Sequence, residues 1–254
     1  MQTGKAHLSV VTLAVALLIA PAAGAQSPQQ FAPDATRYMA LGDSIAAGYK
    51  AMPVTEGYAY RLYLGGVFDR IPHTLFTNAA VPGSTSTDVL AYQVPLATMP
   101  HGFGPGYITL SVGGNDLLAI LQFVKTGATA EEVFVFAQGV LDQFGHNLGA
   151  ILAGLRAGLP AAKVFVANQY PLPALAAALP VAADLIDAFN AIVAQVVAGS
   201  GEGFYLVDVH SAFDGQRNLV EGDRPYASIF EVHPTNVGHR VMAKAFAEVI
   251  ESNK

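Results

Sequence analysis

A serine lies shortly after a short apolar run in the segment YMALGDSIAAGY, residues 38–49. The run is typical of a buried strand, and Ser44 stands just beyond its carboxyl end, after Gly42 and Asp43. A serine in this place can act as a nucleophile if a neighbouring base takes its proton. The structural alternative is a helix start, because Asp and Ser are favoured N-cap residues. Taken alone, this segment favours the structural alternative.

Two further glycine-containing loops follow predicted strands and carry hydrogen-bond donors. One runs over residues 78–84 and includes Gly83, and the other is GGND at residues 113–116. The Gly83 N–H and the Asn115 side-chain amide, together with the Ser44 N–H, would form an oxyanion hole for a tetrahedral intermediate. The alternative is that both loops are only the turns that a parallel sheet requires.

A base for the serine is expected near the C-terminal end, in the segment IFEVHPTNVGH. His233 lies just before a predicted helix for which Thr235 is a suitable N-cap. The rival base is His210, because Asp208 stands two residues earlier and would point to the same face of a strand. We expect structural roles for the other histidines of the mature chain, which are His73, His101, His146 and His239.

The predicted elements would bring these segments together. Short apolar runs alternate with amphipathic stretches, which indicates a parallel sheet with helices on both faces. In such sheets, ligands bind at the carboxyl ends of the strands. Strands are predicted over residues 38–41, 74–78, 107–112, 163–168 and 204–209, and helices over 58–68, 87–96, 116–124, 129–155, 181–198 and 236–251.

Four sequence blocks, in order, resemble those of the SGNH (GDSL) hydrolase family: Gly42-Asp43-Ser44, Asn78 to Gly83, Gly113 to Asp116, and His233-Pro234-Thr235. Each block alone is a weak motif, but the four together are specific and span most of the chain. The resemblance implies that Ser44 is the nucleophile and His233 the base. It also implies an oxyanion hole made of the Ser44 N–H, the Gly83 N–H and the Asn115 side chain.

The same resemblance implies a fold and a cofactor requirement. The expected fold is an α/β, three-layer, flavodoxin-like one, with a parallel sheet of about five strands and helices on both faces. No metal and no cofactor are expected. Asp43 and Asp116 lie within the motifs, and we expect them to hold the loops rather than to react.

The chain departs from the family pattern beside the predicted base. The family usually has an aspartate three residues before the histidine, where this chain has Phe230. Glu231, two residues before His233, is our preferred acid, because its extra methylene extends its reach. The alternatives are a Ser–His dyad oriented by a backbone carbonyl, or another acid from the group Asp208, Asp214 and Asp223.

The remaining sequence sets the compartment and excludes several kinds of partner. Residues 1–25 have the layout of a secretory signal peptide, which predicts a secreted or periplasmic protein with one hydrolase domain over residues 26–254. The chain has no cysteine and a net charge of −6, without a basic cluster. We therefore expect no disulfide and no nucleic-acid partner, and no transmembrane segment in the mature chain. The sequence does not indicate an oligomeric state.

The resemblance implies hydrolysis of carboxylic esters, with either short-chain or lipid acyl groups. A carbohydrate O-acetyl esterase would use the same chemistry with a different pocket. A non-catalytic binding module on the same scaffold is the alternative from another class, and the missing aspartate at position 230 favours it. The apolar segment over residues 170–185 is either a lipid-facing flap or, as we prefer, a covered helix with its connection.

Overall fold

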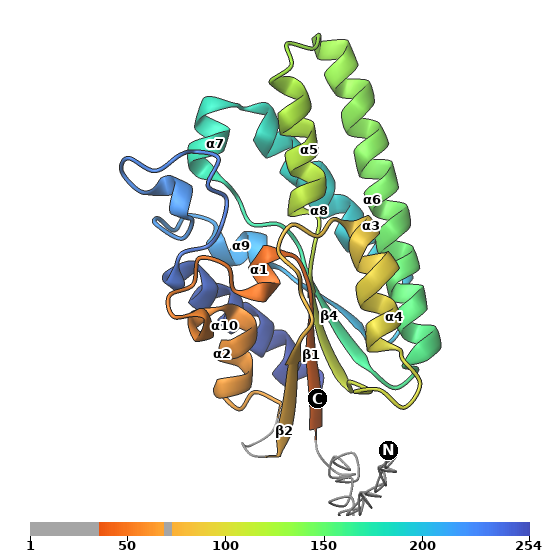
Figure 1. Ribbon diagram of the computed structural model, residues 1–254. Helices are drawn as coiled ribbons and strands as arrows, with labels where there is room; N and C mark the ends of the chain where they lie inside the picture. Colours follow the sequence, from red (N-terminus) through yellow and green to blue (C-terminus); the bar gives the residue numbers. More distant parts are fainter. Residues whose placement is uncertain (1–35, 69–72) are drawn as a thin grey trace, which may run out of the picture. The chain divides into compact units, whose positions relative to one another are not determined.

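Five parallel strands form the centre of the computed structural model, which describes residues 36–68 and 73–254 (Figure 1). The strand order is β2-β1-β3-β4-β5. Because the order reverses beside β1, the carboxyl ends of β1 and β3 form the switch point at which such sheets bind ligands. The strands are β1 (Thr36–Gly42), β2 (Thr74–Asn78), β3 (Tyr107–Ser111), β4 (Lys163–Ala167) and β5 (Phe204–Val207).

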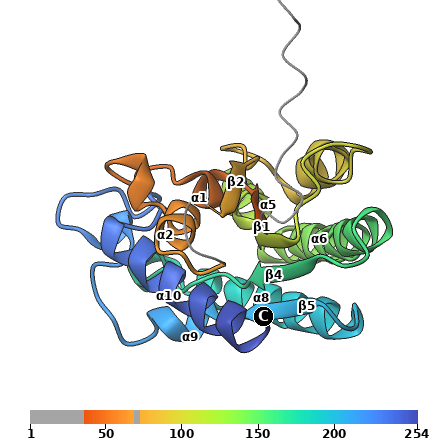
Figure 2. The same cartoon turned by 90° about the horizontal axis from the view of Figure 1, so that it is seen from below.

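The helices cover both faces of the sheet, and Figure 2 shows α6 and α10 on opposite sides of it. The longer ones are α2 (Tyr58–Leu64), α5 (Gly114–Val124), α6 (Ala130–Gly158), α8 (Val181–Gly199) and α10 (Asn236–Ser252). The shorter ones are α1 (Ser44–Ala47), α3 (Ser86–Asp88), α4 (Val94–Ala97), α7 (Pro173–Ala178) and α9 (Val209–Phe213), with the turns η1 (Val54–Glu56), η2 (Val89–Gln93) and η3 (Glu221–Asp223). These layers confirm the predicted α/β fold.

Alternating residues of the central strands bury their side chains in two separate cores. In β1, Met39 and Leu41 pack in the core under α5, α6 and α8, whereas Tyr38 and Ala40 pack in the core under α2 and α10. Because successive side chains of a strand point to opposite faces, a strand covered on both sides must be apolar throughout. This explains why the strands appear in the sequence as continuous apolar runs.

Some predicted elements end earlier or break. The helix predicted over residues 87–96 is three segments, with a π-helical turn at η2, because Pro95 has no N–H for the regular helical bond. The strand predicted to reach residue 209 stops at Val207, because Asp208 accepts the Ser211 N–H and starts α9. The helix predicted to residue 68 ends at Leu64. The predicted signal peptide, residues 1–25, lies outside the described residues.

Within the described residues, one helix is long and apolar enough to cross a membrane by length and composition alone. This helix is α8, with a mean hydropathy of 1.6. Its residues Ile186, Phe189, Val193 and Val197 are buried against the sheet in the same core as α6. The position of α8 is therefore that of a core helix in an α/β layer.

Gly42 allows β1 and β3 to approach closely at their carboxyl ends. The Asp43 N–H donates to the Ser111 carbonyl at 3.1 Å, and a Cβ on Gly42 would lie 1.9 Å from that carbonyl oxygen. The φ angle of Gly42 is +132°, which side-chain-bearing residues rarely adopt. No other residue type fits this position without displacing a strand.

We expect Gly42→Ala to lower the free energy of unfolding by about 3–5 kcal/mol, because it adds both a clash and backbone strain. Urea denaturation measures the loss. Gly139→Ala is the control, because Gly139 lies in α6 with open space around it. That change should stabilise the protein by about 0.5–1 kcal/mol. Equal stability of Gly42→Ala and wild type would contradict the close approach.

Candidate active site

Ser44 is the first residue of α1 and lies directly beyond the carboxyl end of β1. Asp43, not Ser44, is the N-cap, because the Asp43 Oδ1 accepts the Ile45 N–H at 2.9 Å. The Ser44 hydroxyl therefore makes no capping hydrogen bond. As the first N–H of a helix, the Ser44 N–H also has no intrahelical acceptor and remains available to a ligand.

Two hydrogen bonds join Ser44, His233 and Glu231 in one chain. The Ser44 Oγ lies 2.9 Å from His233 Nε2, and His233 Nδ1 lies 2.5 Å from Glu231 Oε1. Because a carboxylate only accepts hydrogen bonds, Nδ1 carries the proton and Nε2 accepts from the serine hydroxyl. Thr235 caps α10 by accepting the Gly238 N–H, which fixes the segment that carries His233.

The other proposed acids have structural partners elsewhere. Asp208 caps α9 through Ser211, and the nearest carboxylate to His210 Nε2 is Asp187 at 3.9 Å. The structure therefore does not pair His210 with Asp208 as the rival arrangement requires. Asp223 accepts the Ala174 N–H, and Asp214 is the C-cap of α9.

The loop that contains Gly83 is tied to the ends of β1 and β3. Asn115 Nδ2 donates to the Ser84 carbonyl at 2.9 Å, which leaves its second N–H for a ligand. The Val81 N–H donates to the Gly42 carbonyl at 3.1 Å. Within the described part of the chain, no acceptor is assigned to the Gly83 N–H. The structure therefore joins the predicted oxyanion residues to the same strand ends as Ser44.

The profile of the GDSL-like lipase/acylhydrolase family matches residues 40–241 of the chain. This range contains all four of the blocks that suggested the resemblance. The chain belongs to this family. The match confirms the predicted family and assigns this GDSL hydrolase to a group of ester-cleaving enzymes. No curated protein sequence is significantly similar to the chain.

Solved structures with low sequence identity share the fold of this GDSL hydrolase. A lipase from a goat rumen metagenome has a TM-score of 0.64 at 21% identity, covering 84% of this chain and 97% of its own. An extracellular lipase from Streptomyces rimosus has a TM-score of 0.62 at 22% identity, covering 87% and 100%. An acetylxylan esterase from Geobacillus stearothermophilus has a TM-score of 0.61 at 17% identity, covering 85% and 95%.

The electrostatic surroundings of the GDSL hydrolase site keep Glu231 ionised. Partial burial raises the pKa of this carboxyl, but hydrogen bonds from His233 and Lys50 outweigh burial and lower it below its usual range. The Lys50 Nζ lies 3.2 Å from Glu231 Oε2. Phe230, at the position where the family usually has its aspartate, is half-exposed and packs under the Lys125 ammonium group.

The two motif aspartates hold loops, as their predicted structural role requires; Asp43 is buried and Asp116 is partly buried. Asp116 accepts hydrogen bonds from both the N–H and the hydroxyl of Ser86, at 3.0 and 2.6 Å. Burial raises the pKa of Asp116, and burial together with the charge of Asp116 raises that of Asp43 to about 7. Within the described residues, no cluster of three or more His, Asp or Glu side chains could hold a metal.

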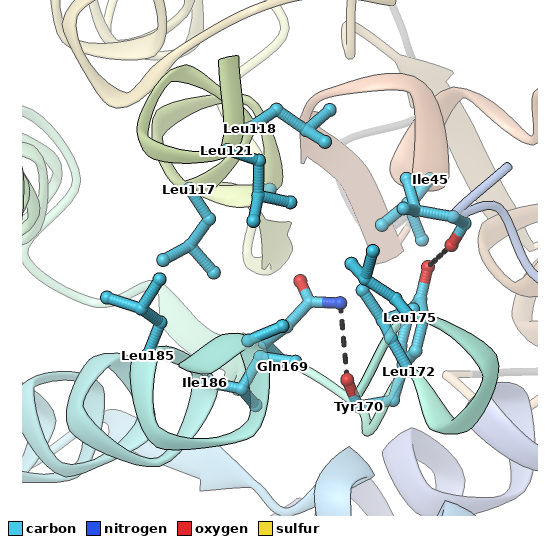
Figure 3. A pocket seen from close by; sticks show the side chains of 13 residues that line it. Ile45, Leu117, Leu118, Leu121, Gln169, Tyr170, Leu172, Leu175, Leu185 and Ile186 are labelled. Atoms are coloured by element: carbon cyan, nitrogen blue, oxygen red, sulfur yellow. Dashed lines mark hydrogen bonds between the residues drawn. The ribbon is translucent and has the colours of Figure 1, made fainter. Parts of the chain in front are cut away.

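An apolar cavity lies between α5, α7 and α8 and is also lined by Ile45 of α1 (Figure 3). The empty space between its side chains, counted together with the open solvent at its mouth, is about 460 Å³. Ile45 and Val232, the direct neighbours of Ser44 and His233, both line it. Most of the remaining wall is aliphatic, and includes Leu117, Leu118, Leu121, Leu172, Leu175 and Ile186. The cavity can therefore accept an apolar group, and sequence neighbours of both Ser44 and His233 form part of its wall.

Sequence reasoning missed three groups at this site. Gln93 is buried, and its side chain bonds both backbone groups of Gly42 at 2.8 Å. Lys50 contacts Glu231, and the ring of Tyr49 lies 4.7 Å from that of His233. None of the three belongs to a recognisable spacing pattern.

Asp43 should make the stability of the protein depend on pH. Its pKa is 3.8 ordinarily and about 7 in the folded protein, so the protonated carboxyl stabilises the fold fully below pH 3.8. This contribution is lost as the pH rises to 7. Asp43→Asn keeps an acceptor for the Ile45 N–H but never ionises. We expect the melting temperature of wild type to fall, relative to that of Asp43→Asn, between pH 4 and 7.

Asp116 and the other carboxyl groups are present in both proteins, so the difference between the two melting curves isolates Asp43. Melting temperatures measured from pH 4 to 8 provide the test. A constant difference across this range would contradict the burial of an ionisable carboxyl at position 43.

Proposed function

We propose that the chain is an exported serine hydrolase that cleaves carboxylic esters through an acyl-enzyme on Ser44. The observation that supports this most strongly is the hydrogen-bonded chain from Ser44 Oγ through His233 to Glu231. Export is inferred from residues 1–25 alone, and residues 26–254 would be the mature hydrolase domain.

In the acylation step, His233 Nε2 takes the proton of the Ser44 hydroxyl while Oγ attacks the ester carbonyl carbon. The negative charge passes to the carbonyl oxygen, which the Ser44 N–H, the Gly83 N–H and the Asn115 amide stabilise. Glu231 holds the Nδ1–H tautomer and balances the imidazolium. The tetrahedral intermediate then expels the alcohol, which leaves with the proton from Nε2.

In the deacylation step, water replaces the alcohol. His233 Nε2 takes a proton from the water as its oxygen attacks the acyl carbon, and the same oxyanion donors stabilise the second intermediate. Collapse of this intermediate releases the carboxylic acid, and the proton on Nε2 returns to Ser44 Oγ. The enzyme ends in its starting state, with one water molecule consumed for each ester cleaved.

The lining of the cavity favours an aliphatic acyl group over an acetyl group on a sugar. Leucine and isoleucine side chains dominate its wall, and an aliphatic chain gains about 0.8 kcal/mol for each buried methylene. The carbohydrate O-acetyl esterase alternative needs polar side chains to bind sugar hydroxyls, and this cavity provides few. We therefore propose esters with an aliphatic acyl chain as the substrate class.

The first functional prediction concerns the nucleophile. Ser44→Ala should leave the fold intact and reduce the hydrolysis of a nitrophenyl ester by about 10⁴-fold or more. Labelling by a fluorophosphonate probe, which needs an activated serine, should also disappear. His210→Ala is the control and should keep most of the activity. If wild type is not labelled, or if Ser44→Ala stays active, the chain is not the serine hydrolase we propose, and the binding-module alternative gains support.

The second functional prediction concerns the acyl chain. Wild type should show higher kcat/KM for nitrophenyl octanoate than for the acetate, because the longer chain fills the cavity. Leu118→Trp, at a half-buried position in its wall, should reduce the octanoate value about tenfold and leave the acetate value nearly unchanged. Leu64→Trp, on an exposed helix end, is the control. Equal losses on both esters would place the acyl chain elsewhere.

A further inference from the structure

Glu231 is held at both of its carboxylate oxygens, by two different parts of the chain. Oε1 faces His233 Nδ1 at 2.5 Å, and Oε2 faces the Lys50 ammonium at 3.2 Å. Lys50 comes from the loop that follows the serine helix α1, whereas Glu231 and His233 come from the loop before α10. The Lys50–Glu231 ion pair therefore bridges the nucleophile loop and the base loop.

The backbone at Lys50 adopts an unusual conformation. Its φ angle is +68°, in the left-handed region that non-glycine residues seldom occupy. Such strain persists where surrounding contacts enforce it, and it is frequent at functional sites. On one side the Tyr49 N–H donates to the Ser44 carbonyl at 2.9 Å. On the other, the backbone of Met52 makes two hydrogen bonds, at 3.0 and 2.7 Å, to the Asn236 side chain.

An aromatic contact completes the arrangement around Lys50. The Lys50 Nζ lies 5.6 Å from the centre of the Tyr49 ring, and that ring meets the His233 imidazole edge-on at 4.7 Å. The ammonium group thus lies near both Tyr49 and Glu231, on the exposed side of the site. Besides the serine, His233 contacts the ring of Tyr49 and the carboxylate of Glu231. Lys50 contacts both of these groups.

A glutamate two residues before the histidine needs such a restraint. It has one more rotatable bond than aspartate, and about a quarter of its side chain is exposed to solvent. Phe230, three residues before the histidine, packs against Lys125 and offers no acceptor. Holding the Glu231 carboxylate in the position that faces Nδ1 costs conformational entropy. A second contact offsets part of this cost.

We propose that Lys50 is a positioning residue that clamps Glu231 against His233, an inference that rests on the serine hydrolase function proposed above. The ammonium group contacts no reacting atom. It restricts the glutamate to the conformation in which Oε1 accepts the Nδ1 proton. Because like charges repel, it also disfavours the positive charge that forms on the imidazole during the reaction. Removing Lys50 therefore changes both the position of Glu231 and the charge on His233.

The charged and titratable groups around the clamp are few. Lys50 faces Glu231, Tyr49 and, at longer range, Glu221, whose carboxylate pairs with Arg224 at 2.9 Å. Tyr170 is the other ionisable neighbour of Glu231, and its hydroxyl donates to the Val232 carbonyl. Among residues 36–68 and 73–254, only Lys50 and His233 form an ion pair or hydrogen bond with the Glu231 carboxylate.

The test compares Lys50→Met, which removes the charge, with Lys50→Arg, which keeps it. With nitrophenyl butyrate, we expect Lys50→Met to lower kcat roughly three- to tenfold at unchanged KM, because the ion pair is partly exposed. The acid limb of its pH–rate profile should differ from that of wild type, because the imidazolium loses both a repelling cation and a fixed carboxylate. Lys50→Arg should keep the wild-type profile. Lys244→Met, which breaks an exposed pair with Glu248, is the matched control.

A double-mutant cycle separates positioning from a general loss of stability. Glu231→Gln alone should lower kcat strongly, and adding Lys50→Met to it should cost nothing more, because the clamp has no carboxylate to hold. Fully additive losses, or a Lys50→Met enzyme with the wild-type rate and pH profile, would overturn the proposal. If Lys50→Arg behaves as Lys50→Met does, the charge is not what acts, and the proposal also fails.

The failure of the clamp and the failure of the hydrolase function have different signatures. Wild type that hydrolyses no ester and takes no fluorophosphonate label refutes the function. The clamp is then still measurable by NMR as the downfield Nδ1 proton of His233, which should persist in Lys50→Arg and broaden in Lys50→Met. Active wild type with the same Nδ1 signal in all three proteins refutes the clamp alone.

Discussion

The close approach of β1 and β3 at their carboxyl ends is the constraint on which the site depends. Gly42 has no side chain to separate the strands, and the Asp43 N–H bonds directly to the Ser111 carbonyl. This places the first residue of α1 and the start of α5 at the same edge of the sheet. Asp43 becomes buried there, at the energetic cost of a desolvated carboxyl whose pKa rises to about 7. Because Asp43 caps the helix, the Ser44 hydroxyl remains available for a hydrogen bond to the base.

The sequence predicted the elements whose patterns are local. Both faces of the central strands are covered, so their residues are apolar throughout. At the edge of the sheet, the strand over residues 74–78 was predicted with its observed bounds. The errors lie where a side chain intervenes. Pro95 interrupts the regular helix, and Asp208 starts a helix where a strand was expected to continue. The end of a helix or strand can depend on a single hydrogen bond, and the spacing of apolar residues does not predict that bond.

The contacts of the site were less predictable than its residues. Motif order indicated Ser44 and His233, but the choice of Glu231 depended on a loop conformation set by contacts distant in sequence. The Lys50–Glu231 pair joins residues 181 positions apart and has no spacing signature. The cavity likewise depends on the packing of α7 and α8 against α5. A covered helix was preferred to a flap for residues 170–185, but the bounds of α7 were not predicted. Side-chain contacts between loops follow from the folded backbone, which a single sequence does not display.

The loop before α10 couples the two halves of the site. Val232 lines the cavity, Ile229 packs against the leucines of α5 and α7, and His233 lies one residue beyond Val232. An aspartate at position 230 would leave this loop without the apolar ring that Lys125 now covers. Moving the acid to position 231 therefore lets position 230 pack, while the longer glutamate still reaches Nδ1. The longer glutamate also has more conformational freedom than an aspartate, and the Lys50 cation from the nucleophile loop is placed to restrict it.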